Sequence, residues 1–182
     1  MNSTSTQPGN PMPLQPSVGS FRINQEPPTF FVDMDEVVAD WFALARTYMP
    51  EIINNASNFQ WPDLYALAPN LYRDLPPTKD MHELWDYVKK YNPVMLTAIP
   101  RRWSWPKVTQ HKREWMAEHI GAHVEVRFGP HAEDKQFHCR KPNDVLIDDN
   151  HKNITQWISR GGIGILHTSA ADTIAQLKTY GY

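Results

Sequence analysis

Two aspartates, separated by a single residue, follow a short apolar segment near the start of the chain. Residues 29–33 (TFFVD) have the composition of a buried strand, and Asp33 and Asp35 stand at its end. Carboxylates are costly to bury unless they are paired or bind a cation. An ionised aspartate can attack phosphorus without a partner base and form an aspartyl-phosphate. Alternate residues of a strand point to the same side, so we expect the Asp35 carboxyl beside Asp33, acting as acid and base.

Further polar groups stand where other predicted strands end. They are Thr97, the segment 129–141 (GPHAEDKQFHCRK) and the pair Asp148–Asp149. In parallel α/β sheets ligands bind beyond the carboxyl ends of the strands, so we expect these groups at one edge with Asp33 and Asp35. Four carboxylates at one edge repel one another unless a cation lies among them. Aspartates without a neighbouring Cys or His favour Mg²⁺, which keeps positions open for water and a substrate phosphate.

Apolar patterns along the chain predict the elements that must position these groups. We predict strands at 29–33, 94–98, 124–129, 144–149 and 163–168, and helices at 36–49, 79–91, 104–121, 152–160 and from about 170. Strands that alternate with helices indicate an α/β fold of three layers, a parallel sheet with helices on both faces. Short strands that are apolar throughout fit such a sheet, because both of their faces are covered.

Length and composition favour one domain that follows a flexible tail. Residues 1–28 are rich in Pro, Ser and Asn, a composition that does not offset the entropy of ordering, and residues 29–182 are expected to form the domain. The formal net charge of −2 provides no basic surface for long nucleic acid. The single cysteine, Cys139, excludes an intrachain disulfide and is interpreted as structural. Without an apolar run of ~18 residues or a secretory signal, we expect a cytoplasmic protein with no membrane partner.

The ordered set of motifs resembles the haloacid dehalogenase-like (HAD) phosphatases. The segment DMDEVVADW (33–41) is similar to their nucleophile motif, VMLTA (94–98) to their strand ending in Thr or Ser, and VLIDD (145–149) to their acidic pair. Together with the helix pattern W…K.EW…H.G, which ends at Gly121, these segments look most like the 5′(3′)-deoxyribonucleotidases and their phage and bacterial relatives. The resemblance covers about residues 29–160. For a phage-encoded chain it would place the protein in the host cytoplasm.

This resemblance implies a role for each matched residue. Asp33 would be the nucleophile and a Mg²⁺ ligand, and Asp35 would be the acid and base, with its backbone carbonyl on the metal. Thr97 would hydrogen-bond the transferred phosphoryl group, and the Asp148–Asp149 pair would complete the metal site. Glu36 stands where relatives often have Gly, so the chemistry transfers more securely than the substrate preference.

The family also uses a lysine that neutralises the nucleophile and the phosphate together. Lys141 precedes the strand 144–149 and lies seven residues before Asp148. An extended segment of that length spans ~20 Å at about 3.3 Å per residue, which would place Lys141 near the opposite edge of the sheet. Lys135 follows the strand 124–129 at the correct edge. We favour Lys135, and Lys141 and Arg140 remain alternatives.

Residues 50–78, which we expect to be irregular, fall where these phosphatases usually carry a small cap over the active site. The candidates for substrate binding are Trp41, Trp61, Tyr65, Ala98 and Arg101. Stacking of a base on an aromatic side chain contributes ~1–3 kcal/mol. Alternatively, the aromatic residues form the small core of the cap itself, and Arg101 belongs to a solvated loop.

The sequence thus predicts a Mg²⁺-dependent phosphomonoesterase that acts on a small nucleotide, most closely a 5′-deoxyribonucleotidase. The alternatives are a polynucleotide 3′-phosphatase, a sugar-phosphate phosphatase and a non-catalytic nucleotide-binding protein. The presence of both Asp33 and Asp35 argues against the last, because a pure binding protein has no need for the second carboxyl. Relatives are commonly dimers, so the resemblance leaves a homodimer open.

Overall fold

The computed structural model describes residues 26–50, 61–100, 105–129 and 131–182. Most of the predicted tail, the candidate Arg101 and the predicted first residue of the helix 104–121 lie outside the described residues. The side chain of the candidate Trp61 lies outside them as well.

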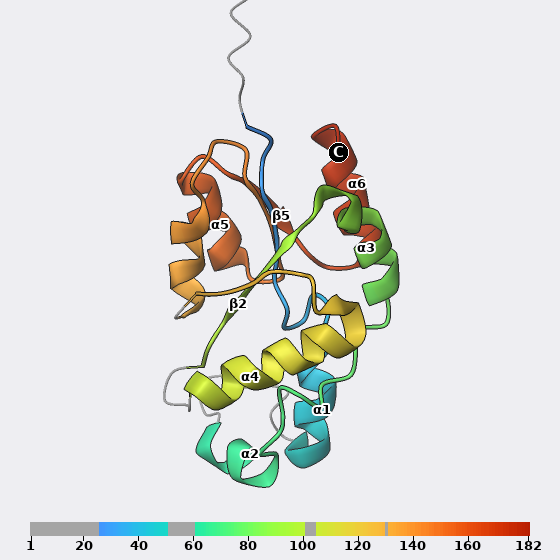
Figure 1. The fold of residues 1–182 in the computed structure, drawn as a ribbon, viewed down its shortest axis with the longest axis vertical. Helices are drawn as coiled ribbons and strands as arrows, with labels where there is room; N and C mark the ends of the chain where they lie inside the picture. Colours follow the sequence, from blue (N-terminus) through green and yellow to red (C-terminus); the bar gives the residue numbers. More distant parts are fainter. Residues whose placement is uncertain (1–25, 51–60, 101–104, 130) are drawn as a thin grey trace, which may run out of the picture.

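Five parallel strands form one sheet through the centre of the domain (Figure 1). They are β1 (Phe30–Val32), β2 (Val94–Ala98), β3 (Val126–Gly129), β4 (Val145–Asp148) and β5 (Ile163–Leu166). Their order is β3-β2-β1-β4-β5, so β1 is the central strand and pairs in parallel with both β2 and β4. The predicted α/β fold class is confirmed.

Helices cover both faces of this sheet, and the alternation of side chains along β1 explains how. Phe30 and Val32 belong to a core shared with α3 (Met81–Val88), α4 (Trp105–Met116) and α6 (Ala170–Thr179). Phe31 points to the other face, where it meets Trp157 of α5 (His151–Ser159) with ring centroids 5.2 Å apart. Figure 1 shows α5 on one side of the sheet and α3 with α6 on the other. The strands β1, β2 and β4 are buried along almost their whole length, so they read as continuous apolar runs.

The predicted helix 36–49 is wrong in its first part. The helix α1 covers only Trp41–Tyr48, and residues 34–40 form a tight turn instead. The Met34 carbonyl accepts hydrogen bonds from the backbone N–H groups of Val38 and Ala39 at 3.0 and 2.9 Å. Val38 and its neighbour Val37 are fully buried in this turn, which is why their apolar character imitated a helical face. The Asp40 side chain caps the true start of α1 by accepting from Ala43 N at 2.8 Å.

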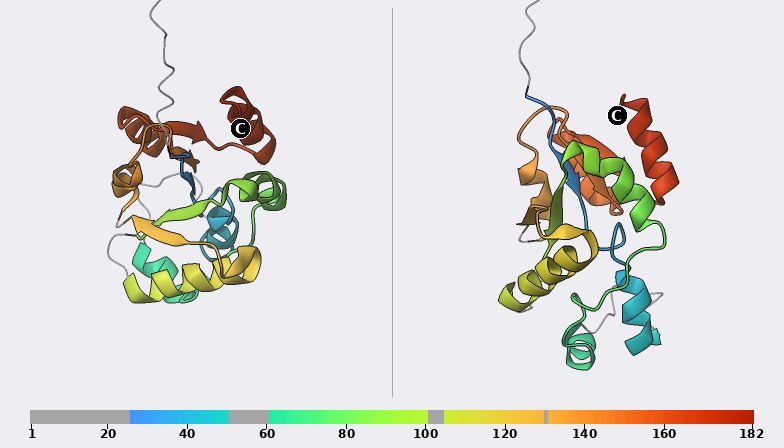
Figure 2. Two further views of the ribbon diagram at one scale, coloured as in Figure 1. Left: turned by 45° about the horizontal axis from the view of Figure 1, so that its top comes forward. Right: turned by 45° about the vertical axis from the view of Figure 1, so that its right-hand side comes forward.

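The predicted irregular segment 50–78 contains a helix. The helix α2 covers Trp61–Leu67, and a series of turns leads from it toward α3. In both Figure 1 and Figure 2, α1 and α2 lie beside each other beyond the end of the sheet toward which β1 runs. Among the described residues, no helix has the length and apolar content needed to cross a membrane.

Candidate active site

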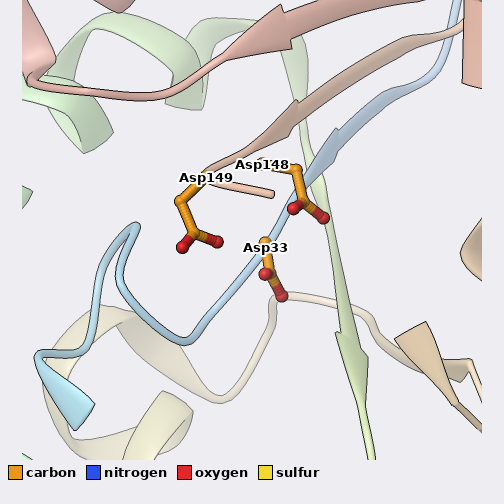
Figure 3. Close-up of side chains that lie close together, drawn as sticks. All are labelled: Asp33, Asp148 and Asp149. Carbon is orange, nitrogen blue, oxygen red and sulfur yellow. The ribbon is translucent and has the colours of Figure 1, made fainter. Parts of the chain in front are cut away.

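Three aspartates from two neighbouring strands meet at the carboxyl edge of the sheet. Asp33 directly follows β1, Asp148 is the last residue of β4, and Asp149 comes next in the chain. One carboxylate oxygen from each lies within 4.8 Å of the others. Figure 3 shows the three side chains close together at this edge. The parallel register of β1 and β4 brings these distant parts of the sequence together.

Lys135 supplies the positive charge nearest to this cluster. Its ammonium group lies 2.7 Å from Asp33 Oδ1 and 2.7 Å from Asp148 Oδ2, and the side chain is buried. Lys135 belongs to the short 3₁₀ helix η5 (Ala132–His138), which follows β3. The start of η5 is held by Asp134, whose carboxylate accepts from His131 N at 3.0 Å.

Lys141, the alternative to Lys135, lies away from the cluster. Its ammonium group donates to the carbonyl of Pro27 at 2.8 Å, near the beginning of β1. That position is at the amino edge of the sheet. It agrees with the expectation that an extended segment from Lys141 to Asp148 would span the sheet.

The electrostatics of the cluster show a deficit of positive charge. Burial, together with the neighbouring Asp148, raises the pKa of Asp33 to about 8, although Lys135 opposes the shift. Burial and Asp148 also raise the pKa of Asp149 to about 7, although part of that residue is exposed. Burial alone would lower the pKa of Lys135, but the Asp33 and Asp148 carboxylates outweigh it and raise that pKa above its ordinary value.

The two aspartates after β4 differ in their surroundings. Asp148 is fully buried and accepts hydrogen bonds from Asn150 N at 2.9 Å and from Asn153 Nδ2 at 3.0 Å, besides its contact with Lys135. The Asn153 amide therefore fixes the orientation of this carboxylate from the first turns of α5. Asp149 accepts no hydrogen bond from the residues that the structure describes, so its oxygens are free for a ligand.

These residues fit a hard divalent cation. The three ionised carboxylates and Lys135 sum to a charge of −2, which one Mg²⁺ balances. Mg²⁺ takes oxygen ligands and retains water in the positions that the protein does not fill. The raised pKa values of Asp33 and Asp149 come first from burial and then from repulsion by Asp148, and a cation bound among the carboxylates would oppose both effects.

The side chain of Asp35 does not join this cluster, and the expectation that it points with Asp33 along one strand is wrong. The strand β1 ends at Val32 and Asp35 lies in the turn that follows Asp33, so strand alternation does not apply to this pair. Its Oδ2 lies 2.7 Å from the ammonium group of Lys112. Two roles of Asp35 stay predictions. One is that its backbone carbonyl binds the metal, and the other is that its carboxyl acts as acid and base.

Lys112 is the lysine of the helix pattern W…K.EW…H.G, and its place in the site was not predicted from the sequence. It is fully buried and also donates to Thr97 Oγ1, at the end of β2, at 2.6 Å. A signal was present, because Lys112 lies four residues after Val108 and three before Trp115, on the buried face of α4. A lysine at such a position needs a buried partner.

The candidates for substrate binding fall into different environments. Trp41 is only 7% exposed and belongs to the main core, and Tyr65 is half-buried. Tyr65 and Tyr72 bring their hydroxyl groups within 3.5 Å of each other. Trp41 and Tyr72 lie in the main core and Tyr65 packs against it, so among the described residues these side chains do not form a separate small core in the segment 50–78. Ala98 ends β2, next to Thr97, and is half-buried.

Comparisons with known proteins bear on the fold. No protein-family model matches the sequence, and no curated protein matches it. A hydrolase from Streptococcus pneumoniae TIGR4 is similar in structure, with a TM-score of 0.56 and 12% identity, and the match covers 82% of this chain and 97% of that one. For a HAD-superfamily hydrolase from Ehrlichia chaffeensis the TM-score is 0.48 and the identity 11%, over 85% and 97% of the two chains. The likeness to the Streptococcus pneumoniae hydrolase shows a shared fold.

Proposed function

We propose that this protein is a Mg²⁺-dependent phosphomonoesterase that works through an aspartyl-phosphate on Asp33, with a deoxyribonucleoside 5′-monophosphate as its preferred substrate. The supporting observation is the contact of one lysine, Lys135, with Asp33 and Asp148 at the edge where the acidic cluster forms. A nucleophilic carboxylate that approaches a phosphate dianion needs such a positive charge beside both. The preference for a deoxyribonucleotide is supported by the motif resemblance.

The first half-reaction transfers the phosphoryl group to the protein. An oxygen of Asp33 bonds to phosphorus, and the bond from phosphorus to the ester oxygen breaks. The electron pair of that bond stays on the leaving oxygen, which takes a proton from the Asp35 carboxyl. Thr97 donates a hydrogen bond to a phosphoryl oxygen, and Lys135 balances the negative charge.

The second half-reaction returns the protein to its starting state. The Asp35 carboxylate takes a proton from water as the water oxygen bonds to phosphorus. The bond between phosphorus and the Asp33 oxygen breaks, which releases inorganic phosphate and restores both carboxyl groups. Asp33, Asp148 and Asp149 would hold the Mg²⁺, which when bound neutralises negative charge on the phosphoryl oxygens.

A substrate panel tests this proposal. The purified protein with Mg²⁺ is given mononucleotides, sugar phosphates, 3′-phosphorylated oligonucleotides and p-nitrophenyl phosphate, and released phosphate is measured. We expect the highest kcat/KM with deoxyribonucleoside 5′-monophosphates, and a higher value with either of the other natural classes would replace the substrate assignment.

The variant Asp33→Asn tests the covalent mechanism. It preserves the shape of the side chain but removes the nucleophile, so we expect no measurable turnover and an unchanged fold by circular dichroism. Wild-type activity in this variant would refute the aspartyl-phosphate. If the wild-type protein released no phosphate from any member of the panel, the function of a non-catalytic nucleotide-binding protein would take its place.

A further inference from the structure

The buried ammonium group of Lys112 connects two side chains that the proposed mechanism uses. Lys112 comes from α4, more than ten residues after β2, and its Nζ donates to Asp35 Oδ2 at 2.7 Å and to Thr97 Oγ1 at 2.6 Å. Its side chain is 0% exposed. Nothing in the phosphoryl-transfer steps above uses this lysine.

The hydrogen-bond chemistry of an ammonium group restricts both partners. A lysine ammonium only donates, so each oxygen that it contacts must accept. Asp35 Oδ2 therefore accepts from Lys112, and a proton carried by this carboxyl is placed on Oδ1. Asp35 Oδ1 is buried and has no hydrogen-bond partner among the residues that the structure describes. It is the oxygen that remains for a leaving group or for water.

The same restriction acts on Thr97. A hydroxyl group has one hydrogen and two lone pairs, and in Thr97 one lone pair accepts from Lys112. The hydroxyl hydrogen is then directed away from Lys112. Thr97 is fully buried, and the residues that the structure describes offer its hydroxyl hydrogen no acceptor. A phosphoryl oxygen of the substrate would accept it.

The cap side of the site holds Lys112 in place. The Lys112 ammonium lies 4.7 Å from the centre of the Tyr72 ring, and Tyr72 follows α2 in the chain. An ammonium over an aromatic face is stabilised by the ring's negative face. Trp115, one turn further along α4, donates from its indole N–H to the Leu75 carbonyl at 2.7 Å and ties α4 to the same segment.

We infer that Lys112 is a positioning residue that sets the direction of two hydrogen bonds in the reaction. It makes Oδ1 of Asp35 the oxygen that gives and takes protons, and it makes the Thr97 hydroxyl a donor to the phosphoryl group. This inference rests on the proposed function for the chemistry, but the arrangement of the three side chains stands on the contacts alone.

The variant Lys112→Met tests this role, with Lys107→Met on the exposed part of α4 as the matched control. p-Nitrophenolate leaves as a stable anion and needs no proton, whereas a nucleoside leaves as a poor leaving group that must be protonated. We expect Lys112→Met to lower kcat/KM for a deoxyribonucleoside monophosphate by about 10²–10⁴ more than for p-nitrophenyl phosphate. Lys107→Met should leave both values unchanged.

A purely structural role would lower both activities by the same factor and leave their ratio unchanged, and that result would overturn the inference. In the double variant Lys112→Met/Asp35→Asn we expect no further change of the ratio beyond that of Asp35→Asn, because both substitutions act on the same proton transfer. An additive change would also count against Lys112 acting through Asp35.

A second measurement needs no turnover and separates the inference from the proposed function. The ammonium of Lys112 in ¹⁵N-labelled wild-type protein should give an NMR signal protected from exchange, which Asp35→Asn and Thr97→Val each shift. If the wild-type protein hydrolyses nothing but these shifts are seen, the proposed function fails and the arrangement around Lys112 stands. If neither substitution moves the signal, Lys112 does not hold these two groups.

Discussion

Adding Mg²⁺ to the metal-free protein should raise its Tm, and the substitution Asp149→Asn should remove most of that increase. The reason is the repulsion among Asp33, Asp148 and Asp149, whose oxygens lie within 4.8 Å of one another. Lys135 compensates one of the three charges. A divalent cation relieves the remaining repulsion in the folded state, whereas the unfolded chain holds no such site.

Two quantities bear on the size of the effect: the repulsion in the metal-free protein and the concentration of Mg²⁺ relative to its Kd. Two like charges 4.8 Å apart repel by about 3 kcal/mol at an effective dielectric constant of ~20. Each pair of ionised carboxylates therefore lowers the free energy of unfolding of the metal-free protein. Mg²⁺ at about 100 times its Kd adds about 2.7 kcal/mol to the free energy of unfolding. For a chain of 182 residues this corresponds to an increase in Tm of about 5–11 °C.

The increase should depend on pH with a defined sign. In the folded, metal-free protein the pKa values of Asp33 and Asp149 are raised to about 8 and about 7, above the ordinary value of 3.8. Stabilisation from a raised carboxyl pKa is fully present below the unfolded pKa and is lost as the pH rises through the folded pKa. The metal-free protein should therefore lose stability between about pH 4 and pH 8. Mg²⁺ binds the ionised carboxylates, so its effect on Tm should be larger at pH 8.5 than at pH 6.

Differential scanning calorimetry with Mg²⁺ or with EDTA at both pH values measures these changes. Asp149→Asn removes a ligand and a repelling charge, so without metal the variant should melt above the wild-type protein at pH 8.5 and respond weakly to Mg²⁺. Asp86→Asn, at an exposed site on α3, is the matched control and should respond as the wild-type protein does. An equal Mg²⁺ response in Asp149→Asn and wild type would refute the assignment of the metal site, and a response independent of pH would refute the electrostatic argument.

Two further predictions concern the lysines and the core. Lys135→Met should lower kcat by about 10²–10³, because it removes the cation that contacts Asp33, while Lys141→Met should leave kcat within a factor of two of the wild-type value. The reverse ranking in steady-state assays would restore Lys141 as the motif lysine. Trp157→Ala should lower the free energy of unfolding by about 3–5 kcal/mol, since the ring is fully buried against Phe31 and its indole N–H donates to the Asp144 carbonyl at 2.8 Å. Urea denaturation measures this loss, and a change below 1 kcal/mol would show that α5 is not packed as described.

The sheet could be predicted from the sequence because its strands β1, β2 and β4 are buried on both faces. Five apolar segments, separated by helical patterns and turns, leave few arrangements other than a parallel sheet. The carboxyl edge follows from that topology, and with it the meeting of Asp33 with the Asp148–Asp149 pair. Lys135 could be favoured over Lys141 by chain length alone, because an extended residue advances by about 3.3 Å.

The turn after Asp33 could not be predicted by the same means. Val37 and Val38 are apolar because the turn is buried in the main core, and periodicity does not separate a buried turn from a helix. Glu36 adopts a positive φ of 61°, a conformation that favours glycine, and its carboxylate accepts from Phe42 N at 2.8 Å. That contact compensates for the unfavourable backbone conformation of Glu36, and only the structure reveals it.

The sequence by itself determined which acidic and hydroxyl residues stand at the end of which strand. In a parallel sheet, these residues must then lie at the same edge. Only the tertiary structure decided which cation the second aspartate, Asp35, contacts, because Lys112 lies 77 residues away on a helix that packs over the sheet. Periodicity and strand geometry are properties of a few neighbouring residues, so they predict where a side chain stands within one helix or strand. The pairing of a buried cation with a particular carboxylate depends on how whole elements pack against one another, and it appears only when they are assembled.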